Sequence, residues 1–137
     1  MEKKSIVVVT SIIENEFWEI LLSQRYDPKF PDAHLKRDLP WWKNDFWENL
    51  KETILREIKE ETGLDVDIWE MLPTHILNLR KTEEIHQHTL VFCYKSKKTW
   101  GELSSKDHKI QDLQRVKKED LHKYDLLVWV KEILFFL

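Results

Sequence analysis

Glycine is nearly absent from this chain of 137 residues, which contains only Gly63 and Gly101. Loops that cradle phosphate groups are built from several closely spaced glycines, because glycine permits positive φ and close approach of the backbone to a ligand. The sequence therefore argues against P-loop and dinucleotide-binding folds.

Cysteine is equally scarce, since Cys93 is the only one. An internal disulfide is excluded, and the apolar run from Leu90 to Tyr94 predicts a buried structural thiol. A reduced thiol fits a cytoplasmic protein. The N-terminus lacks an apolar stretch long enough for a signal peptide, and the apolar segment 126–137 is too short to span a bilayer, so we expect no membrane contact.

Neither sign of charge dominates the chain. Its 22 Lys and Arg residues stand against 25 Asp and Glu residues, for a formal net charge of −3. This balance does not indicate a general nucleic-acid binder. No repeat, linker or low-complexity run divides the chain, and its length predicts a single domain over residues 1–137.

Hydrophobic periodicity predicts strands interspersed with two helices. The strands are expected at 5–13, 17–23, 36–39, 65–80, 85–95 and 113–116, with the fourth interrupted at Pro73. The helices are expected at 50–62 and 120–136. This order predicts an α+β fold in which a mixed sheet lies between helices, an α/β/α sandwich.

Local signals support the helix at 50–62. Asn49 followed by Glu52 fits a capping box, and Gly63 supplies the left-handed residue that ends many helices. A stripe that faces the core repeats every fourth residue, at Leu50, Ile54 and Ile58.

The same helix carries three carboxylates within two turns, on Glu57, Glu60 and Glu61. Side chains three and four residues apart are neighbours on a helix, and like charges that close repel unless they share a cation or a proton. Hard oxygen ligands of this kind suit Mg²⁺ or Mn²⁺. The alternative is a solvated acidic face that pairs with the lysine and arginine side chains of the same helix.

The segment from Trp42 to Leu64 resembles the Nudix box: Gly, five residues, Glu, seven residues, Arg-Glu, an aliphatic residue, any residue, Glu-Glu, any residue, Gly and an aliphatic residue. Glu48 and the run 56–64 match every defined position, and Trp42 alone departs, standing where the pattern has glycine. Weaker similarity extends to residues 21–25, which resemble the family's second strand. It also covers residues 39–43, which resemble its Leu-Pro-Gly-Gly-Lys segment with both glycines replaced.

The resemblance implies a hydrolase of nucleoside diphosphates linked to another group, in which water attacks phosphorus and Mg²⁺ or Mn²⁺ is the cofactor. The expected partner is a small nucleotide, such as a nucleoside triphosphate. Glu60 and Glu61 would be metal ligands, and Glu57 a ligand or the general base. Glu48 would be an outer ligand or a partner of Arg56, which would hold the carboxylates in place.

The resemblance also suggests contacts around the helix. The backbone carbonyl of Trp42 would stand where a glycine carbonyl often binds metal. The rings of Trp41 and Trp42 either stack on a nucleobase or pack into the core. Arg25 and Lys43 are expected to contact phosphate, with ordinary surface ion pairs as the alternative.

A further acidic residue from a late loop often serves the family as base or ligand. Three residues qualify, and the sequence does not choose among Glu102, Asp107 and Asp112. His86 and His88 face the same side of a strand, but no third ligand follows at a suitable spacing, so we do not expect a zinc site.

Two other functions remain open. One is a non-catalytic nucleotide-binding regulatory module on the same fold, which the tryptophan pair favours and the retained glutamates oppose. The other is an RNA 5′-end pyrophosphohydrolase, for which the net charge offers no clear basic path. Leu79 and Lys81 replace the Pro or Tyr that mark members acting on ADP-ribose or dinucleoside polyphosphates, which disfavours those substrates. We expect a monomer or a homodimer.

Overall fold

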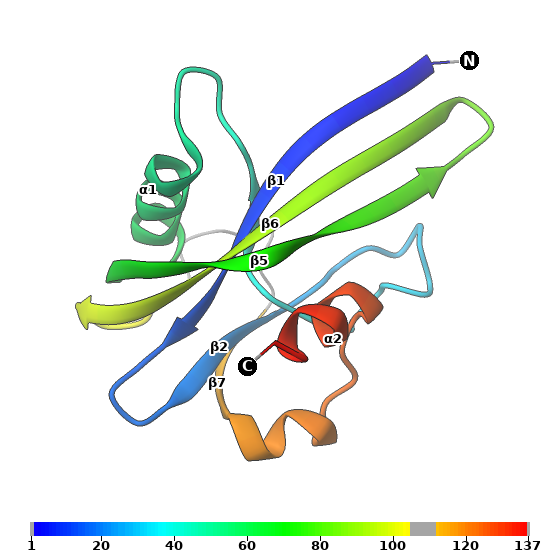
Figure 1. Ribbon diagram of the computed structural model, residues 1–137. Helices are drawn as coiled ribbons and strands as arrows, with labels where there is room; N and C mark the ends of the chain where they lie inside the picture. Colours follow the sequence, from blue (N-terminus) through cyan, green and yellow to red (C-terminus); the bar gives the residue numbers. More distant parts are fainter. Residues whose placement is uncertain (1, 105–111, 137) are drawn as a thin grey trace.

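A computed structural model describes residues 2–104 and 112–136 (Figure 1). Its seven strands are β1 (Glu2–Glu14), β2 (Glu19–Gln24), β3 (Arg37–Asp38), β4 (Trp41–Lys43), β5 (Asp65–Lys81), β6 (Ile85–Trp100) and β7 (Leu113–Lys117). The helices are α1 (Leu50–Thr62), the 3-10 helix η1 (Lys118–Lys123) and α2 (Val128–Leu134). The predicted α+β arrangement of a mixed sheet and helices is confirmed.

Strand β1 is the centre of the sheet. Along one edge it runs parallel to β6 from end to end, with Glu2 opposite Ile85 and Glu14 opposite Lys97. Along its other edge it pairs antiparallel with β4 and with β2. The full order is β3-β2-β1-β6-β5, with β4 paired to β1 and β7 paired to β2. Because only β1 and β6 are parallel, the sheet is mixed, as predicted.

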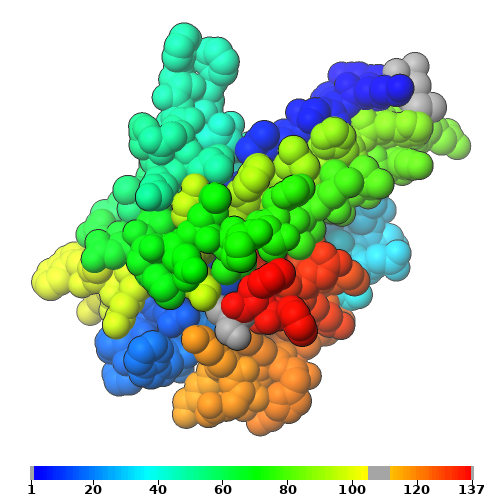
Figure 2. Space-filling model, in the orientation of Figure 1, coloured from blue at the N-terminus to red at the C-terminus, as the bar shows by residue number. Residues whose placement is uncertain are grey.

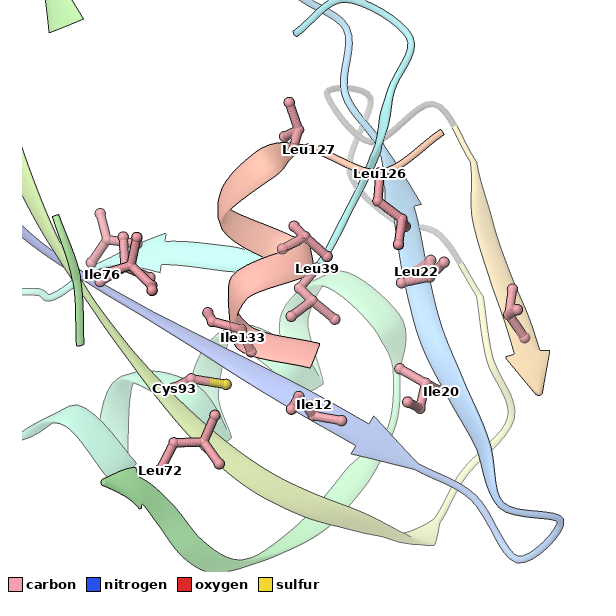
Figure 3. Packing of buried hydrophobic residues seen from close by; sticks show 14 residues of the cluster. Ile12, Ile20, Leu22, Leu39, Leu72, Ile76, Cys93, Leu126, Leu127 and Ile133 are labelled. Carbon is pink, nitrogen blue, oxygen red and sulfur yellow. The ribbon is translucent and has the colours of Figure 1, made fainter. Parts of the chain in front are cut away.

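The two α-helices pack on opposite faces of the sheet, and each covers its own apolar cluster. Successive strand residues point to opposite faces. Val8 and Ile12 therefore face α2, whereas Val9 and Ile13 face α1. Figure 3 shows the α2 side, where side chains of the strands meet Ile133. Burial on both faces explains why β1 reads as an almost unbroken apolar run.

Helix α1 has the bounds that the sequence predicts. The Asn49 side chain accepts a hydrogen bond from the backbone N–H of Glu52 at 2.9 Å. Gly63 has φ 76° and donates its N–H to the carbonyl of Lys59. Ile54 and Ile58 are fully buried. One face of α1 is therefore fixed against the sheet, and its neighbouring face is left for other contacts.

The two glycines of the chain lie against each other, at the joint between the end of α1 and the end of β6. Gly101 has φ 99°, and a Cβ atom built on it would lie 2.6 Å from the carbonyl oxygen of Gly63. The backbone N–H of Ser104 donates to the carbonyl of Thr62 at 2.9 Å. The missing side chains let the segment after β6 pass closely over the C-terminal end of α1.

The interruption predicted at Pro73 is present in the pairing of β5 with β6, where residues 72–74 have no partner, but it does not divide the strand. Strand β5 is continuous from Asp65 to Lys81, although its ladder with β6 shifts register between Met71 and His75. Proline is tolerated on an edge strand because its missing N–H does not break a ladder there. The order of strands puts β5 at the edge of the sheet, which explains the exception.

The predicted terminal helix at 120–136 is wrong as a single element. It divides into η1 and α2, with an extended stretch between them. Arg37 of β3 donates its N–H to the carbonyl of Asp125, and its carbonyl accepts from the N–H of Leu127, so this stretch bonds to β3 instead of to its own helix. Leu126 and Leu127 are buried from this extended backbone.

Other element boundaries move by a few residues. Strand β1 begins at Glu2, β6 continues to Trp100, and the predicted strand at 36–39 shrinks to two residues. The segment before α1 stands away from the body as a turquoise projection (Figure 2), and there Phe46 and Trp47 are 76% and 90% exposed. Within the described ranges, no helix has the length and apolar character needed to cross a membrane.

Candidate active site

A cleft of about 420 Å³ opens between the end of β2, the β3–β4 segment and α1. Its walls are formed by Ser23, Gln24, Arg25, Tyr26, Asp38, Pro40, Trp41, Trp42, Lys43, Glu57 and Glu61. Six residues that the sequence singles out thus meet in one cavity: Arg25, Trp41, Trp42, Lys43, Glu57 and Glu61. They come from segments far apart along the chain, and the sheet brings them together.

Glu57 and Glu61 reach the cleft because they lie one helical turn apart on the same side of α1. The indole N–H of Trp42 donates to Oε2 of Glu61 at 2.6 Å. Trp42 is only 4% exposed, and its ring packs in the cluster under α1. The buried tryptophan therefore both fills the core and fixes one carboxylate of the cleft.

Arg56 forms hydrogen bonds with three glutamates of the box. Its guanidinium donates two hydrogen bonds of 2.9 Å to Glu48, one of 2.9 Å to Glu57 and one of 3.2 Å to Glu60. These bonds hold the pKa of the Glu48 carboxyl below its ordinary value and raise that of Arg56. Glu48 is thus a partner of Arg56, one of the two roles predicted for it.

Glu60 points elsewhere. Its side chain is 59% exposed and faces Arg56, and it does not line the cleft. Among residues 2–104 and 112–136, no group of three or more acidic, histidine or cysteine side chains is close enough to hold a metal ion. Helix α1 contributes two carboxylates to the cleft, from Glu57 and Glu61, and this pair still fits Mg²⁺, which often takes one or two carboxylates and fills its shell with water and phosphate oxygen.

The tryptophan pair occupies strand backbone where the family pattern has glycines. Trp41 and Trp42 lie opposite Thr10 and Val9 in the β1–β4 ladder. Neither has a positive φ, since Trp18, Leu35 and Trp47 are the non-glycine residues with that conformation in the part of the chain that the structure describes. Tryptophan is therefore accommodated at both positions without backbone strain.

Arg25 and Lys43 lie on the walls of the same cleft. The Arg25 guanidinium bonds to Asp27 at 3.1 Å, lies 3.9 Å from Asp38, and covers the ring of Trp41 at 5.2 Å from its centroid. Lys43 is exposed. Two cations thus share the cavity with the carboxylates of α1, as a phosphate-bearing ligand would require.

Asp38 is the site residue that the sequence does not reveal. It is 2% exposed, it lines the cleft, and its Oδ2 accepts the indole N–H of Trp41 at 3.0 Å. Its Oδ1 finds no hydrogen-bond partner among the described residues. Burial raises the pKa of this carboxyl to about 7, against the opposing effects of Arg25 and the N–H groups of Trp41 and Leu39. In the sequence Asp38 follows Lys36 and Arg37 directly, so it resembles an ordinary surface charge.

Of the three candidate late-loop acids, the two that the structure describes, Glu102 and Asp112, do not line the cleft. Asp112 bonds to Arg37 at 2.9 Å, and Glu102 is exposed after the end of β6. Asp107 lies outside the described residues. His88 contacts the hydroxyl of Ser5 at 3.0 Å, and neither it nor His86 lines the cleft.

Known proteins share both the sequence pattern and the fold. A family model described as NUDIX domain matches residues 4–135. An 8-oxo-dGTP diphosphatase of Haemophilus influenzae is 34% identical over 85 residues, which cover 57% of this chain and 61% of that protein. The chain therefore matches about three fifths of the length of this relative.

Solved structures agree on the fold. A MutT protein from Methanosarcina mazei has a TM-score of 0.70 at 24% identity, covering 98% of this chain and 94% of that one. A MutT NUDIX hydrolase from Burkholderia pseudomallei reaches 0.75 at 20% identity, covering 98% of each chain. The NUDIX domain of Shewanella oneidensis NrtR, crystallised with ADP ribose, reaches 0.71 at 16% identity, covering 98% and 86%. With a family match over nearly its whole length, and with Glu57 and Glu61 of the box on the wall of a cleft, this chain belongs to the NUDIX family.

Proposed function

We propose that the protein is a divalent-metal-dependent hydrolase that cleaves a phosphoric anhydride bond of a nucleoside triphosphate or a related small nucleotide. The observation that supports this most is the make-up of the cleft, where Glu57 and Glu61 share one cavity with Arg25 and Lys43. Carboxylates for a cation, together with cations for phosphate, meet the two main needs of phosphoryl and nucleotidyl transfer to water.

Glu57 and Glu61 are the proposed ligands of Mg²⁺ or Mn²⁺, with Glu60 and the backbone carbonyl of Trp42 as further donors. When bound, such an ion would neutralise phosphate charge and lower the pKa of a bound water. The chain itself supplies orientation. Arg56 holds Glu57 at 2.9 Å, and the Trp42 indole holds Glu61 at 2.6 Å. Glu57 is either a ligand or the general base.

Arg25 and Lys43 are the proposed phosphate contacts. A guanidinium offers a planar pair of donors to phosphate oxygens, and a lysine adds a point charge. Because Arg25 already bonds to Asp27, its position is fixed before a ligand arrives. The diphosphatase relative suggests a purine nucleoside triphosphate, and an oxidised one in particular, as the first substrate to try.

The test is turnover of a nucleotide panel with Mg²⁺ or Mn²⁺, measured as release of monophosphate and pyrophosphate. The panel holds the common nucleoside triphosphates, 8-oxo-dGTP, ADP-ribose and triphosphorylated RNA. We expect hydrolysis of at least one nucleoside triphosphate, with complete loss on chelation of the metal. Glu61→Gln should lower kcat by about a hundredfold or more, because a metal ligand contributes several kcal/mol to the transition state.

The matched control is Glu52→Gln on the exposed side of the same helix, which should keep its activity. Full activity in both Glu61→Gln and Glu60→Gln would reject the metal role of the box. Exclusive cleavage of the RNA would instead favour an RNA 5′-end pyrophosphohydrolase.

A non-catalytic nucleotide-binding module is the second candidate, because the Trp42 indole engages an oxygen of Glu61 that a metal would use. Calorimetric binding of a nucleotide without turnover at any metal concentration would favour this function. A cytoplasmic location and a monomeric or homodimeric state are part of the same proposal, and light scattering on the purified protein decides the latter.

A further inference from the structure

Phe46 and Trp47 are large apolar side chains that the fold holds in solvent. They occupy the projection, which we define as residues 44–49, and their rings meet edge to face with centroids 4.6 Å apart. The Asn44 amide spans the loop and donates to the carbonyl of Glu48 at 3.1 Å. Trp47 has φ 76°, a backbone conformation that tryptophan rarely adopts. The loop thus keeps a strained backbone for two rings that the core does not use, which indicates a contact outside the chain.

A second exposed apolar surface lies on the face of the sheet that α1 covers. The first half of β1, the start of β6 and the end of β5 extend past the helix at the upper right of Figure 1. Val7 points to the same face as Val9, which packs under α1, and it lies opposite Leu90, which in turn lies opposite Leu77. Leu77 and its neighbour on this face, Leu79, are 54% and 60% exposed. We call this outer part of the α1 face the wing, built from residues 3–7, 75–81 and 86–92.

The wing and the projection differ in charge. Lys3 and Lys81 flank the same residue of β6 in the last row of the wing, and none of the three ranges that form the wing contains an acidic residue. The projection contains Asp45 and Glu48 but no lysine or arginine. The Asp45 side chain is 63% exposed. Opposite potentials of this kind steer two surfaces together and fix their register.

We propose that the protein forms a homodimer in which the projection of each copy docks on the wing of the other. This interface lies outside the cleft and does not depend on the proposed hydrolysis. The backbone N–H of Asn44 donates to the carbonyl of Val7 at 3.0 Å, so the projection begins beside the wing, and in Figure 2 the two diverge from the body as separate arms. Every copy therefore carries both halves of the contact side by side, and one twofold axis forms both contacts at once.

The apolar area of these surfaces suits a dimer. An aromatic side chain buries roughly 150–250 Å², so Phe46 and Trp47 together contribute roughly 300–400 Å². Each copy also covers a similar area of its wing, which brings the total close to the roughly 800 Å² per partner of a stable interface. A membrane surface is a poorer match, because anionic headgroups repel Asp45 and Glu48 and leave the wing uncovered.

Sedimentation equilibrium of the full chain, without nucleotide or metal, tests the proposal. We expect wild type to dimerise with a Kd in the micromolar range. One variant, Phe46→Ser with Trp47→Ser, removes the rings of the projection. A second, Leu77→Glu, places an acid on the wing where the acidic projection docks. Each should raise the Kd by about a hundredfold or more, because its homodimer loses both contacts. All three positions are exposed, and circular dichroism verifies that the variants are folded.

Mixing the two variants tests whether the contact is reciprocal. The mixed dimer keeps one intact contact, between the projection of the Leu77→Glu chain and the wing of the other chain. An equimolar mixture should therefore associate at least tenfold more tightly than either variant alone. Lys81→Glu should weaken wild-type association by about tenfold, since it removes charge complementarity at the rim of the wing.

Trp100→Ser is the matched control, because its ring is 74% exposed at the far end of β6 from the wing, and the Kd should stay unchanged. A wild type that is monomeric at about 1 mM, or a dimer that neither variant weakens, overturns the proposal. A mixture that associates no better than its components overturns the reciprocal contact. A monomer that binds vesicles of phosphatidylcholine and phosphatidylserine through Phe46 and Trp47 would instead assign the projection to a lipid surface.

Discussion

Arg56 connects residues that the chain separates by up to twelve positions. It bonds to Glu48, Glu57 and Glu60, and it lies 3.7 Å from Asp45 at the start of the projecting loop. A guanidinium has five N–H donors in one plane, so a single side chain can fix several carboxylates at once. The spacing of four residues between Arg56 and Glu60 translates directly into contact along a helix. The role of Arg56 on Glu57, its neighbour in the chain, was expected only from the resemblance to the Nudix box.

Asp38 illustrates the opposite case. Its burial depends on how a two-residue strand packs against β2 and under Trp41, and no periodic pattern in the sequence encodes that packing. The same holds for the bond between Trp42 and Glu61, which joins residues 19 positions apart. Contacts made through tertiary packing are the part of the site that sequence reasoning misses.

The buried carboxyl of Asp38 should make stability depend on pH. Its pKa is raised from 3.8 to about 7 in the folded chain. Between these two values the unfolded chain releases the proton while the folded chain keeps it, so the unfolded state binds fewer protons and stability falls as pH rises. Asp38→Asn removes this loss, and it should exceed wild type in stability by roughly 2–4 kcal/mol at about pH 8.

Urea denaturation of both proteins between about pH 4 and about pH 8 measures the effect. The difference between the two should grow with pH across that range and level off above it. Taking the difference removes the contribution of the other carboxylates, which both proteins share. A gap that stays constant with pH would mean that Asp38 is ionised throughout in the folded protein.

At the scale of elements, prediction succeeded where local signals agreed. Helix α1 has a capping residue, an apolar stripe and a terminal glycine, and its bounds match the prediction residue for residue. The segment 124–127 has no glycine or proline that would mark the end of a helix. Its leucines fit a helical stripe equally well, and backbone bonds to Arg37 decide that they are extended. Likewise, Pro73 predicts a break in the strand, and only the sheet order shows that the strand lies at the edge of the sheet, where proline is tolerated.

The N-cap of α1 should be a measurable part of the stability. Asn49→Ala removes the acceptor of the Glu52 N–H, and replacing a capping residue by alanine costs about 1 kcal/mol. We expect a lower urea midpoint with an unchanged m-value, since the surface exposed on unfolding stays the same. Lys51→Ala, at an exposed position in the first turn of the same helix, serves as the control and should leave the midpoint nearly unaltered.

For the molecule as a whole, the apolar cluster between the sheet and α2 encloses the single thiol. Cys93 is 1% exposed in the cluster under α2, as its apolar neighbours predict, and burial raises its pKa to about 12. A thiol in this state reacts only when the structure opens, because the thiolate is the reactive form. The rate of labelling by a thiol reagent should therefore report global unfolding.

Added nucleotide and metal should slow that labelling in proportion to their binding, because a ligand of the folded state lowers the open population. Protein in concentrated urea should react at once and sets the upper rate. Labelling that is fast in native buffer and indifferent to urea would mean that the sheet and α2 separate locally without unfolding.

The joint between Gly63 and Gly101 limits how this sequence can change. A side chain at position 101 would collide with the backbone of position 63, and both residues have φ values that other amino acids rarely adopt. A substitution at position 63 cannot relieve the clash at position 101, because that clash is with the backbone carbonyl of residue 63, which every amino acid retains. In a randomised library selected for folding alone, these two codons should therefore stay fixed even in variants that have lost the glutamates proposed to bind metal.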